Sequence, residues 1–325
     1  MTATPNLQGR VVNFSMSAPN DLARLGFPSA EFDRVVFNLC MRVVRAQGRI
    51  LYGGHLGDDS LTARMFEYTA SAYVPGSIRA RAEGPKPPKP FLHLLPLSEF
   101  RRSSFARLYD IQSRFGSFLE TRLITDDDKY FTLSRRTEKL MFRDPESNEG
   151  TSLVGTPEDL AAFSSTLPAR APPEALTAMR AAARKLTRAR IVLGGKRGDL
   201  GVPGGRDRFE GAMPGIYEET LSSVDAQTPF VLLGAYGGAA RDIAIDLGLI
   251  GSDNEVPYLG EVQPQYREAR AKMCEARHRI PVIDREMMAA VVLREDCEDL
   301  GRDIVAMLAH RLESAGPDRH REQSP

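Results

Sequence analysis

Three glycine pairs stand where the sequence predicts the end of a strand. RILYGGHLGD at 49–58 is nearly repeated as RIVLGGKRGD at 190–199, and LLGAYGGAARD at 232–242 has a similar arrangement. Glycine permits positive φ angles and lets backbone N–H groups approach a ligand closely. The start of a following helix adds a partial positive charge that favours phosphate. The turns therefore predict a cradle for an anion or nucleotide, although tight strand-to-helix turns need such glycines even without a ligand. The glycines are Gly53, Gly54, Gly194, Gly195, Gly237 and Gly238.

Charged and aromatic side chains beside these turns are the first candidates for ligand contacts. Lys196 and Arg197 follow the second glycine pair, where a cation can bind phosphate; the alternative is an exposed loop charge. Tyr236 offers a ring that could stack on adenine. Arg241 lies one helical turn later, within reach of a phosphate or of a surface ion pair. His55 either contacts a base or is exposed to solvent.

Serine and aspartate near the first two predicted strand ends have simpler explanations available. Ser15 and Ser17 end the first strand and could donate to phosphate or ribose, but they are equally well explained as turn formers. Asp58 and Asp59 are interpreted as caps of the next helix rather than metal ligands.

A Pro-Gly turn at Pro214 and Gly215 begins a predicted helix with two adjacent carboxylates, Glu218 and Glu219. Neighbouring helical residues point about 100° apart, so only one of the two is expected to meet the ligand as a ribose-hydroxyl acceptor. Glu219 is preferred. In a hydrolase the same carboxylate would be catalytic, stabilising a ribosyl transition state or orienting water. We expect this glutamate and the three glycine turns to line one cleft.

Alternating strands and helices are predicted through much of 11–252. The stretch 11–73 is predicted as strand, helix, strand, glycine-rich turn and helix, and the alternation returns between 172 and 249. PFVLLG at 229–234 is continuously apolar, as expected for a strand buried on both faces. This order is typical of an α/β fold: a Rossmann-like parallel sheet with helices on both faces.

The middle of the chain is harder to interpret. A Pro-rich connector at 84–90 leads into a predicted buried strand at 91–97. We treat 100–170 as an insertion or partly helical subdomain, with helices expected near 111–122 and 135–143.

The two ends of the chain are predicted to differ from the α/β region. Residues 1–10 and 314–325 are expected to be disordered. Between them and the α/β region, 253–313 is predicted to be a mainly helical C-terminal extension with one edge strand at 280–284.

Composition excludes several classes of function. The 325 residues contain 43 Lys plus Arg and 43 Asp plus Glu, so no global basic field exists to hold nucleic acid or an anionic membrane. No apolar run approaches the roughly 18 residues of a membrane-spanning helix. Neither a phosphate loop GxxxxGK[ST] nor GxGxxG with a ribose-binding acid at the right distance is present, which disfavours common NAD-dehydrogenase and P-loop enzymes.

The cysteines and histidines indicate neither a metal site nor a disulfide framework. Cys40, Cys274 and Cys297 are far apart and odd in number, which suits a reducing cytoplasm. The histidines are isolated, and no nucleophilic triad is suggested by spacing. We therefore expect a cytoplasmic protein without a metal or cofactor.

The segment GAMPGIYEETLSSVDAQTPFVLLGAYGGAARDIA resembles the SLOG superfamily. This Rossmann-like fold is shared by lonely-guy phosphoribohydrolases, DNA-processing Smf proteins, and sensor domains of TRPM channels and anti-phage effectors. The lonely-guy motif is Pro-Gly-Gly-x-Gly-Thr-x-x-Glu. This chain keeps Pro214-Gly215 and the acidic pair but lacks the second glycine and the Gly-Thr. The shorter form, after a GGK strand end, is closer to the sensor branch.

The resemblance implies binding of an NAD-derived nucleotide such as ADP-ribose, in a sensor or signalling role. The alternative is an N-glycosidase that acts on nucleoside monophosphates. A freestanding chain would report to a separate effector protein, sequester its ligand or act as an enzyme after all, and a homo-oligomer is also expected. The likeness covers roughly 10–252.

Overall fold

The structure is a computed structural model that describes residues 6–72, 88–126, 129–147 and 150–314. Most of the two ends predicted to be disordered, 1–5 and 315–325, and most of the proline-rich connector lie outside these residues. The chain divides into two compact units. Among the described residues, unit 1 comprises 6–48, 187–209 and 213–314, and unit 2 comprises 49–72, 88–126, 129–147, 150–186 and 210–212.

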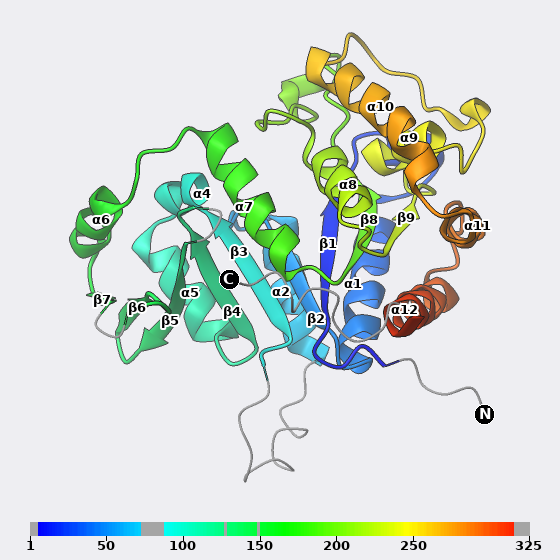
Figure 1. The fold of residues 1–325 in the computed structure, drawn as a ribbon. Helices are drawn as coiled ribbons and strands as arrows, with labels where there is room; N and C mark the ends of the chain where they lie inside the picture. The colour runs from blue at the N-terminus through cyan, green and yellow to red at the C-terminus, as the bar shows by residue number, and fades with distance from the viewer. Residues whose placement is uncertain (1–5, 73–87, 127–128, 148–149, 315–325) are drawn as a thin grey trace. The chain divides into compact units, whose positions relative to one another are not determined.

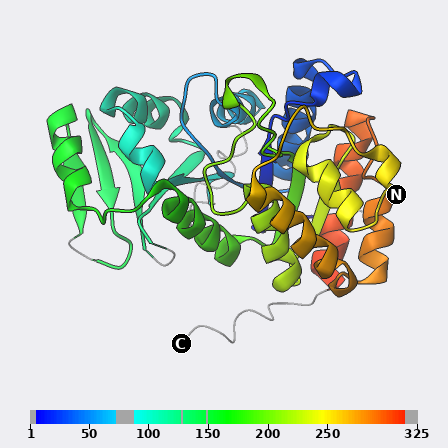
Figure 2. The same cartoon turned by 90° about the horizontal axis from the view of Figure 1, so that it is seen from above.

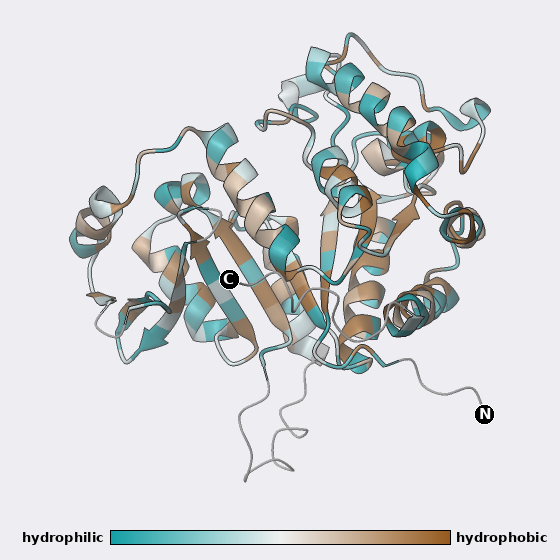
Figure 3. Cartoon of the chain, in the orientation of Figure 1, coloured by the Kyte–Doolittle hydropathy of each residue, from teal (hydrophilic) through white to brown (hydrophobic). Residues whose placement is uncertain are grey.

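Unit 1 is built on three parallel strands in the order β1-β8-β9 (Figure 1). They are β1 (Val11–Ser17), β8 (Ala189–Gly194) and β9 (Phe230–Leu233). The register pairs Ser17 with Gly194 and Leu193 with Leu233, so the carboxyl ends of all three strands lie at one edge. Long apolar side chains fill β8 and β9, which are largely brown in Figure 3, because both faces are covered by helices.

Helices cover both faces of this three-stranded sheet (Figure 2). Three of them share one core with Val192 and Leu232, to which Met288 also belongs, and the others include the contacting pair α1 and α12. The first set is α8 (Gly215–Asp225), α9 (Gly238–Asp246) and α10 (Pro264–Ala276). The second is α1 (Ser29–Arg45), α11 (Val282–Ala289) and α12 (Cys297–Ser314). Short 3-10 helices span Leu22–Leu25, Pro203–Gly205, Ser252–Asn254 and Arg277–Arg279.

The apolar period of α1 explains why it packs as it does. Phe32, Val35, Val36, Leu39 and Val43 recur at steps of three and four and are all buried. This spacing places them on one face of a helix. The predicted helix is therefore confirmed, and it begins at Ser29 directly after Pro28.

Unit 2 contains a parallel strand group followed by an antiparallel one, in the order β2-β3-β4-β5-β6-β7. The pairs β2–β3 and β3–β4 are parallel, and the remaining pairs are antiparallel. The strands are β2 (Arg49–Gly53), β3 (Phe91–Pro96), β4 (Leu119–Ile124), β5 (Tyr130–Arg136), β6 (Lys139–Arg143) and β7 (Thr151–Val154). Its helices are α2 (Leu61–Ala72), α4 (Leu97–Arg102), α5 (Phe105–Phe115), α6 (Pro157–Thr166) and α7 (Pro172–Leu186).

Two helices predicted in the middle of the chain are wrong in whole or in part. The stretch 135–143 is a hairpin in which Arg136 pairs with Lys139 across a two-residue turn, and Thr137 has φ 55°. Leu140 and Phe142 are buried on alternate positions, which is the period of a strand. The helix expected near 111–122 ends at Phe115 and is followed by β4.

The edge strand predicted at 280–284 is also wrong. Pro281 stands at the N-cap, and the chain continues as helix α11 from Val282. Proline supplies the fixed φ of a helix start, and this outweighs the β-branched residues that suggested a strand. The C-terminal segment is otherwise mainly helical, as expected. Among the described residues, no helix combines the length and apolar character needed to cross a membrane.

Candidate functional site

Two of the three predicted glycine turns meet at the carboxyl edge of the unit 1 sheet. Gly194 and Gly195 have φ 63° and 99°, and Gly237 and Gly238 have φ 78° and 68°. The Gly195 carbonyl accepts a hydrogen bond of 3.2 Å from the Ala239 N–H. A Cβ on Gly238 would lie 2.5 Å from the Gly195 carbonyl oxygen. Both left-handed backbone and close packing therefore require glycine here.

The third turn, Gly53-Gly54, needs glycine for a different reason. Neither residue has a positive φ, but a Cβ on Gly53 would lie 2.4 Å from the Met179 sulfur, and one on Gly54 would lie 2.5 Å from Thr62 Oγ1. His55, the next residue, is exposed. This turn belongs to unit 2, so its convergence with the other two remains a prediction.

A carboxylate of the protein occupies the N-terminus of α9, where phosphate was expected. The Gly238 N–H donates to Asp21 Oδ1 at 2.9 Å, and Arg197 Nη1 lies 3.4 Å from Asp21 Oδ2. Burial raises the pKa of Asp21, although Arg197 and the Gly238 amide act in the opposite direction. In this conformation Asp21 provides the negative charge that the helix N-terminus favours.

Arg197 is held inside unit 1 rather than presented to solvent. Its guanidinium donates to Asp242 at 2.8 and 3.2 Å and lies 3.9 Å from the centre of the Tyr258 ring. Burial by itself would lower the pKa of Arg197, but Asp242 more than compensates and the pKa is raised. The predicted phosphate ligand is thus bonded to carboxylates of its own unit.

The loop after β8 is folded around Asp207 and leaves Lys196 at the surface. Asp207 accepts from the backbone N–H groups of Arg197 and Asp199, at 3.2 and 2.9 Å, and from the Asn20 side chain at 2.8 Å. Lys196 is exposed, and its Nζ donates to the Arg208 carbonyl at 2.8 Å. Its ammonium group therefore remains accessible to a ligand.

The start of α8 differs from the start of α9. Its N-cap is Pro214, which has no side-chain acceptor for the first amides of the helix. Gly195 packs directly against this first turn, because a Cβ on Gly195 would lie 2.2 Å from Ile216 Cδ1. The N-terminus of α8, with Gly215, thus lies beside the Gly194-Gly195 turn that precedes Lys196. It offers backbone N–H donors that no cap side chain satisfies.

Glu219, one turn into α8, is fixed by residues from the strands. Arg190 Nη1 donates to Glu219 Oε2 at 2.6 Å and to Ser15 Oγ at 2.5 Å, and Ser15 also donates to Glu219 Oε2. Arg190 Nε donates to Ser223 Oγ at 2.7 Å. The Arg190 side chain is 2% exposed, whereas that of Glu219 is 16% exposed. Burial lowers the pKa of Arg190, and the charge of Glu219 opposes this effect.

The remaining predicted site residues make contacts within their own unit. Tyr236 is fully buried and donates from its hydroxyl to the Glu295 carbonyl at 3.2 Å, so its ring lies in the core. Arg241 donates to the carbonyls of Asn254 and Gly234, at 2.6 and 3.1 Å. The Ser17 carbonyl accepts from the Gly195 N–H at 2.8 Å, and Glu218 is half-buried.

Sequence reasoning missed Arg190 and Asp21. Arg190 is the first residue of the second repeated decapeptide, and Arg49 is the first residue of the other. Arg49 also pairs with a glutamate, since its Nη2 lies 2.8 Å from Glu120 Oε2. The repetition of Arg was therefore a usable signal for an arginine–glutamate ion pair in each unit. Asp21 follows Asn20, and both are residue types that cap helices, but the helix it caps begins 217 positions later.

Metal binding receives no support from the side-chain arrangement. Within the part of the chain that the structure describes, no group of three or more His, Cys, Asp or Glu side chains could hold a metal ion.

Comparison with models of known protein families identifies the family of this chain. The family model described as SLOG cluster2 matches residues 6–301. This range extends beyond the segment whose motifs resemble the superfamily and includes α10, α11 and the start of α12. No curated protein matches the chain.

Proposed function

Because the chain belongs to the SLOG cluster2 family, which indicates a nucleotide-related function, we propose that unit 1 binds an NAD-derived ligand such as ADP-ribose. Binding takes place at the carboxyl edge of β1 and β8, and the protein acts as a sensor rather than as a catalyst. Ligands of parallel α/β sheets generally bind outside the carboxyl ends of the strands.

The observation that carries this proposal is the uncapped start of α8 beside the Gly194-Gly195 turn. A phosphate there accepts hydrogen bonds from the first amides of the helix and gains from the helix dipole. Lys196 supplies a charge-assisted contact at the rim. The start of α9 is less suited to this role because Asp21 already fills it.

The ribose of the ligand is assigned to Glu219 and Ser15. Glu219 is partly exposed, so a ribose hydroxyl can reach its carboxylate while Arg190 holds that group in place. An acceptor fixed in this way loses little side-chain entropy when the ligand binds.

The same pair favours binding over hydrolysis. An oxocarbenium-like transition state gains most from a carboxylate whose negative charge is not already balanced. Glu219 shares its charge with Arg190 at 2.6 Å, which weakens that stabilisation. The missing Gly-Thr of the lonely-guy motif supports the same conclusion. Nucleoside-monophosphate N-glycosidase activity is the second candidate, favoured by the placement of Glu219 one turn into the Pro-Gly helix.

A sensor of this kind reports to a separate effector protein or to further copies of itself. Leu200 and Leu259 support such a surface, since they are 40% and 57% exposed on the loops of unit 1. A cytoplasmic location is supported by three free cysteines, Cys40, Cys274 and Cys297.

The test incubates the purified protein with ADP-ribose, its cyclic isomers, NAD and nucleoside monophosphates. Thermal unfolding and chromatography of the products are measured on the same samples. A raised melting temperature without products is the result expected for the sensor. Release of free base from a nucleoside monophosphate would establish the hydrolase, and neither effect with any of these compounds would contradict both.

A further inference from the structure

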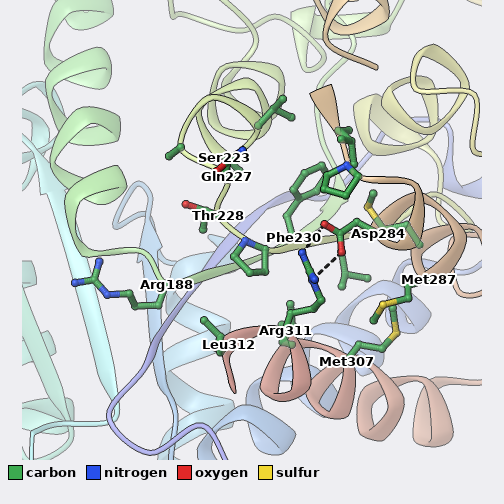
Figure 4. A pocket seen from close by; sticks show the side chains of 18 of the residues that line it. Arg188, Ser223, Gln227, Thr228, Phe230, Asp284, Met287, Met307, Arg311 and Leu312 are labelled. Carbon is green, nitrogen blue, oxygen red and sulfur yellow. Dashed lines mark hydrogen bonds and ion pairs between the residues drawn. The ribbon is translucent and has the colours of Figure 1, made fainter. Parts of the chain in front are cut away.

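A cavity lies in unit 1 at the amino ends of its strands. It has a volume of about 380 Å³ and is lined by Thr187, just before β8, by Phe230 of β9, and by residues of α8, α11 and α12 (Figure 4). Because β8 and β9 run parallel, the length of a strand separates this end from Gly194 and the glycine turns. The volume falls within the range of small-molecule sites.

The outer edge of β9, the last strand in the sheet, carries main-chain groups that border this cavity. The Arg190 N–H donates to the Pro229 carbonyl at 2.9 Å, and Arg190 is in register with Phe230. Alternate residues of a strand direct their N–H and C=O groups to opposite sides, so those of Phe230 face away from β8. The Gly234 N–H faces the same way and donates to the Val292 carbonyl. Among the described residues, neither the N–H nor the carbonyl of Phe230 has a hydrogen-bond partner.

Much of the cavity wall is apolar and adaptable. Phe230, Met287, Met288, Met307 and Leu308 line this part. Methionine side chains are flexible and polarizable, so they adjust to apolar bodies of different shapes. The cavity therefore combines a free main-chain donor and acceptor with space for an apolar side chain.

The charged side chains of the wall are already paired. Arg311 binds Asp284 through two contacts of 2.7 and 2.8 Å, which Figure 4 shows, and Arg279 lies 2.7 Å from Asp225. Each arginine that lines the cavity among the described residues has an interaction partner: Arg10, Arg188, Arg279 and Arg311. These arginines offer no free charge to an anion, so the cavity suits an uncharged ligand.

We propose that this cavity binds a small uncharged amide, namely a single amino acid with an apolar side chain that is acylated and amidated at its ends. An extended residue can exchange two hydrogen bonds with one residue of a neighbouring strand. The ligand's N–H and C=O therefore pair with the carbonyl and the N–H of Phe230, and its side chain lies among the methionines. Main-chain pairing at a sheet edge, with a pocket for the side chain, is a general mode of peptide recognition. This site is independent of the nucleotide site proposed above.

The test adds three compounds to the full-length protein and follows its amide signals by NMR. They are N-acetyl-leucine N-methylamide, the analogue in which an ester oxygen replaces the leucine N–H, and N-acetyl-glycine N-methylamide. The leucine amide should shift the Phe230 N–H signal and bind about tenfold more tightly than the ester, which cannot donate to the Phe230 carbonyl. It should also bind about tenfold more tightly than the glycine compound, which lacks the apolar side chain.

Three results of this titration would overturn the proposal. They are equal affinity for the leucine amide and its ester, no binding of the leucine amide, and shifts confined to residues outside the cavity. Binding that appears only after removal of 315–325 would show that the chain's own end is the occupant, and would also contradict the proposal.

A pair of variants at Phe230 isolates the main-chain contact. Phe230→Pro removes the N–H but not a bond to β8, because Phe230 is the first residue of β9 and its N–H faces outward. Phe230→Ala is the matched control, since it loses the ring and keeps the N–H. The proline variant should bind the leucine amide roughly tenfold more weakly than the alanine variant. Equal affinities of the two variants would contradict pairing with the strand edge.

A second set of variants tests the apolar wall and does not alter β9. Met287→Gln combined with Met307→Gln should weaken the leucine amide about tenfold and the glycine compound much less. Met141→Gln in unit 2 is the control and should bind both compounds normally. An equal loss for the two compounds, or for the control, would show that the methionines do not hold the side chain.

Discussion

At the residue scale, the contact between Arg190 and Glu219 explains why a cation is tolerated inside unit 1. Arg190 is 1% exposed, and Glu219, Ser15 and Ser223 each accept a hydrogen bond from its guanidinium. A buried charge is costly unless it is paired and hydrogen-bonded. The pair therefore holds α8 against β1 and β8 and also fixes the carboxylate that we assign to ribose.

A double-substitution cycle tests this role. Glu219→Leu should lower the free energy of unfolding by about 3–5 kcal/mol, because it leaves Arg190 buried without a counter-charge. Arg190→Met combined with Glu219→Leu should recover most of that loss. Urea unfolding followed by circular dichroism measures both. A double variant as unstable as the single one would show that the pair is not what stabilises this position.

Lys196 is the residue whose removal should affect binding alone. It is exposed and its ammonium group donates to a backbone carbonyl, so Lys196→Ala should leave the unliganded melting temperature unchanged. Loss of a charged hydrogen bond should weaken ADP-ribose binding roughly ten- to hundredfold. Calorimetric titration measures this, with Lys272→Ala on α10 as the exposed-lysine control. If both lysine variants bind as the parent does, Lys196 does not contact the ligand.

His93 makes the stability of unit 2 depend on pH. It is fully buried beside the Gly54 carbonyl at 3.2 Å, and burial lowers its pKa to about 4. The unfolded chain takes up a proton on this histidine below about pH 6.5, whereas the folded protein does so only below about 4. The stability that the protein has with neutral His93 is therefore fully present above pH 6.5. The free energy of unfolding falls as the pH drops from 6.5 toward 4, because only the unfolded chain gains the proton there.

The loss should reach about 3 kcal/mol across this window. His93→Gln keeps a donor for the Gly54 carbonyl but cannot titrate, so the variant should lose less stability between pH 7 and pH 4.5. Urea unfolding at the two pH values measures the difference. The same loss in parent and variant would mean that His93 does not titrate as proposed.

At the scale of elements, the glycine turns position the start of α8 and α9 against the strands. Sequence patterns identified these turns because paired glycines follow apolar strand residues, directly at Gly53 and Gly194 and a few positions after Leu233 at Gly237. They did not reveal that α9 is capped by Asp21 from a distant loop, because capping requires tertiary contact. The β5–β6 hairpin was missed for a related reason: Leu140, Met141 and Phe142 are contiguous, and only burial shows which of them face inward.

Gly238 and Gly204 form a matched pair for testing the turns, since both have φ 68°. At Gly204 an added Cβ meets only Arg206 Cγ at 3.9 Å, so Gly204→Ala should cost about 1 kcal/mol for the backbone alone. At Gly238 the Cβ would lie 2.5–2.7 Å from backbone atoms of Gly194 and Gly195. Gly238→Ala should therefore cost a further 1–3 kcal/mol.

Thermal unfolding and ADP-ribose titration of the two glycine variants make the comparison. Gly238→Ala should also weaken ligand binding, because it displaces the turn that precedes Lys196, whereas Gly204→Ala should not. Equal melting temperatures for the two variants would show that the contact between the glycine turns is loose.

At the scale of the whole molecule, the two repeated decapeptides prove to lie in different units. Each begins with an arginine that pairs with a glutamate, Glu120 in unit 2 and Glu219 in unit 1, and each ends a parallel strand with Gly-Gly. The α/β class was predictable because strand and helix periods alternate along the chain. The division into units was not, since it depends on which segments pack together. The helices after 253 were expected, but their packing on α8, α9 and α1 was not visible in the sequence.

The central claim is that a phosphate binds at the uncapped start of α8, and amide NMR of the ¹⁵N-labelled protein with ADP-ribose tests it most directly. The largest shifts are expected at the N–H groups of Gly215, Ile216, Tyr217 and Lys196, with smaller changes at Gly238. Shifts confined to Gly238 and its neighbours in α9, or to the cavity around Phe230 and Met288, would contradict the claim.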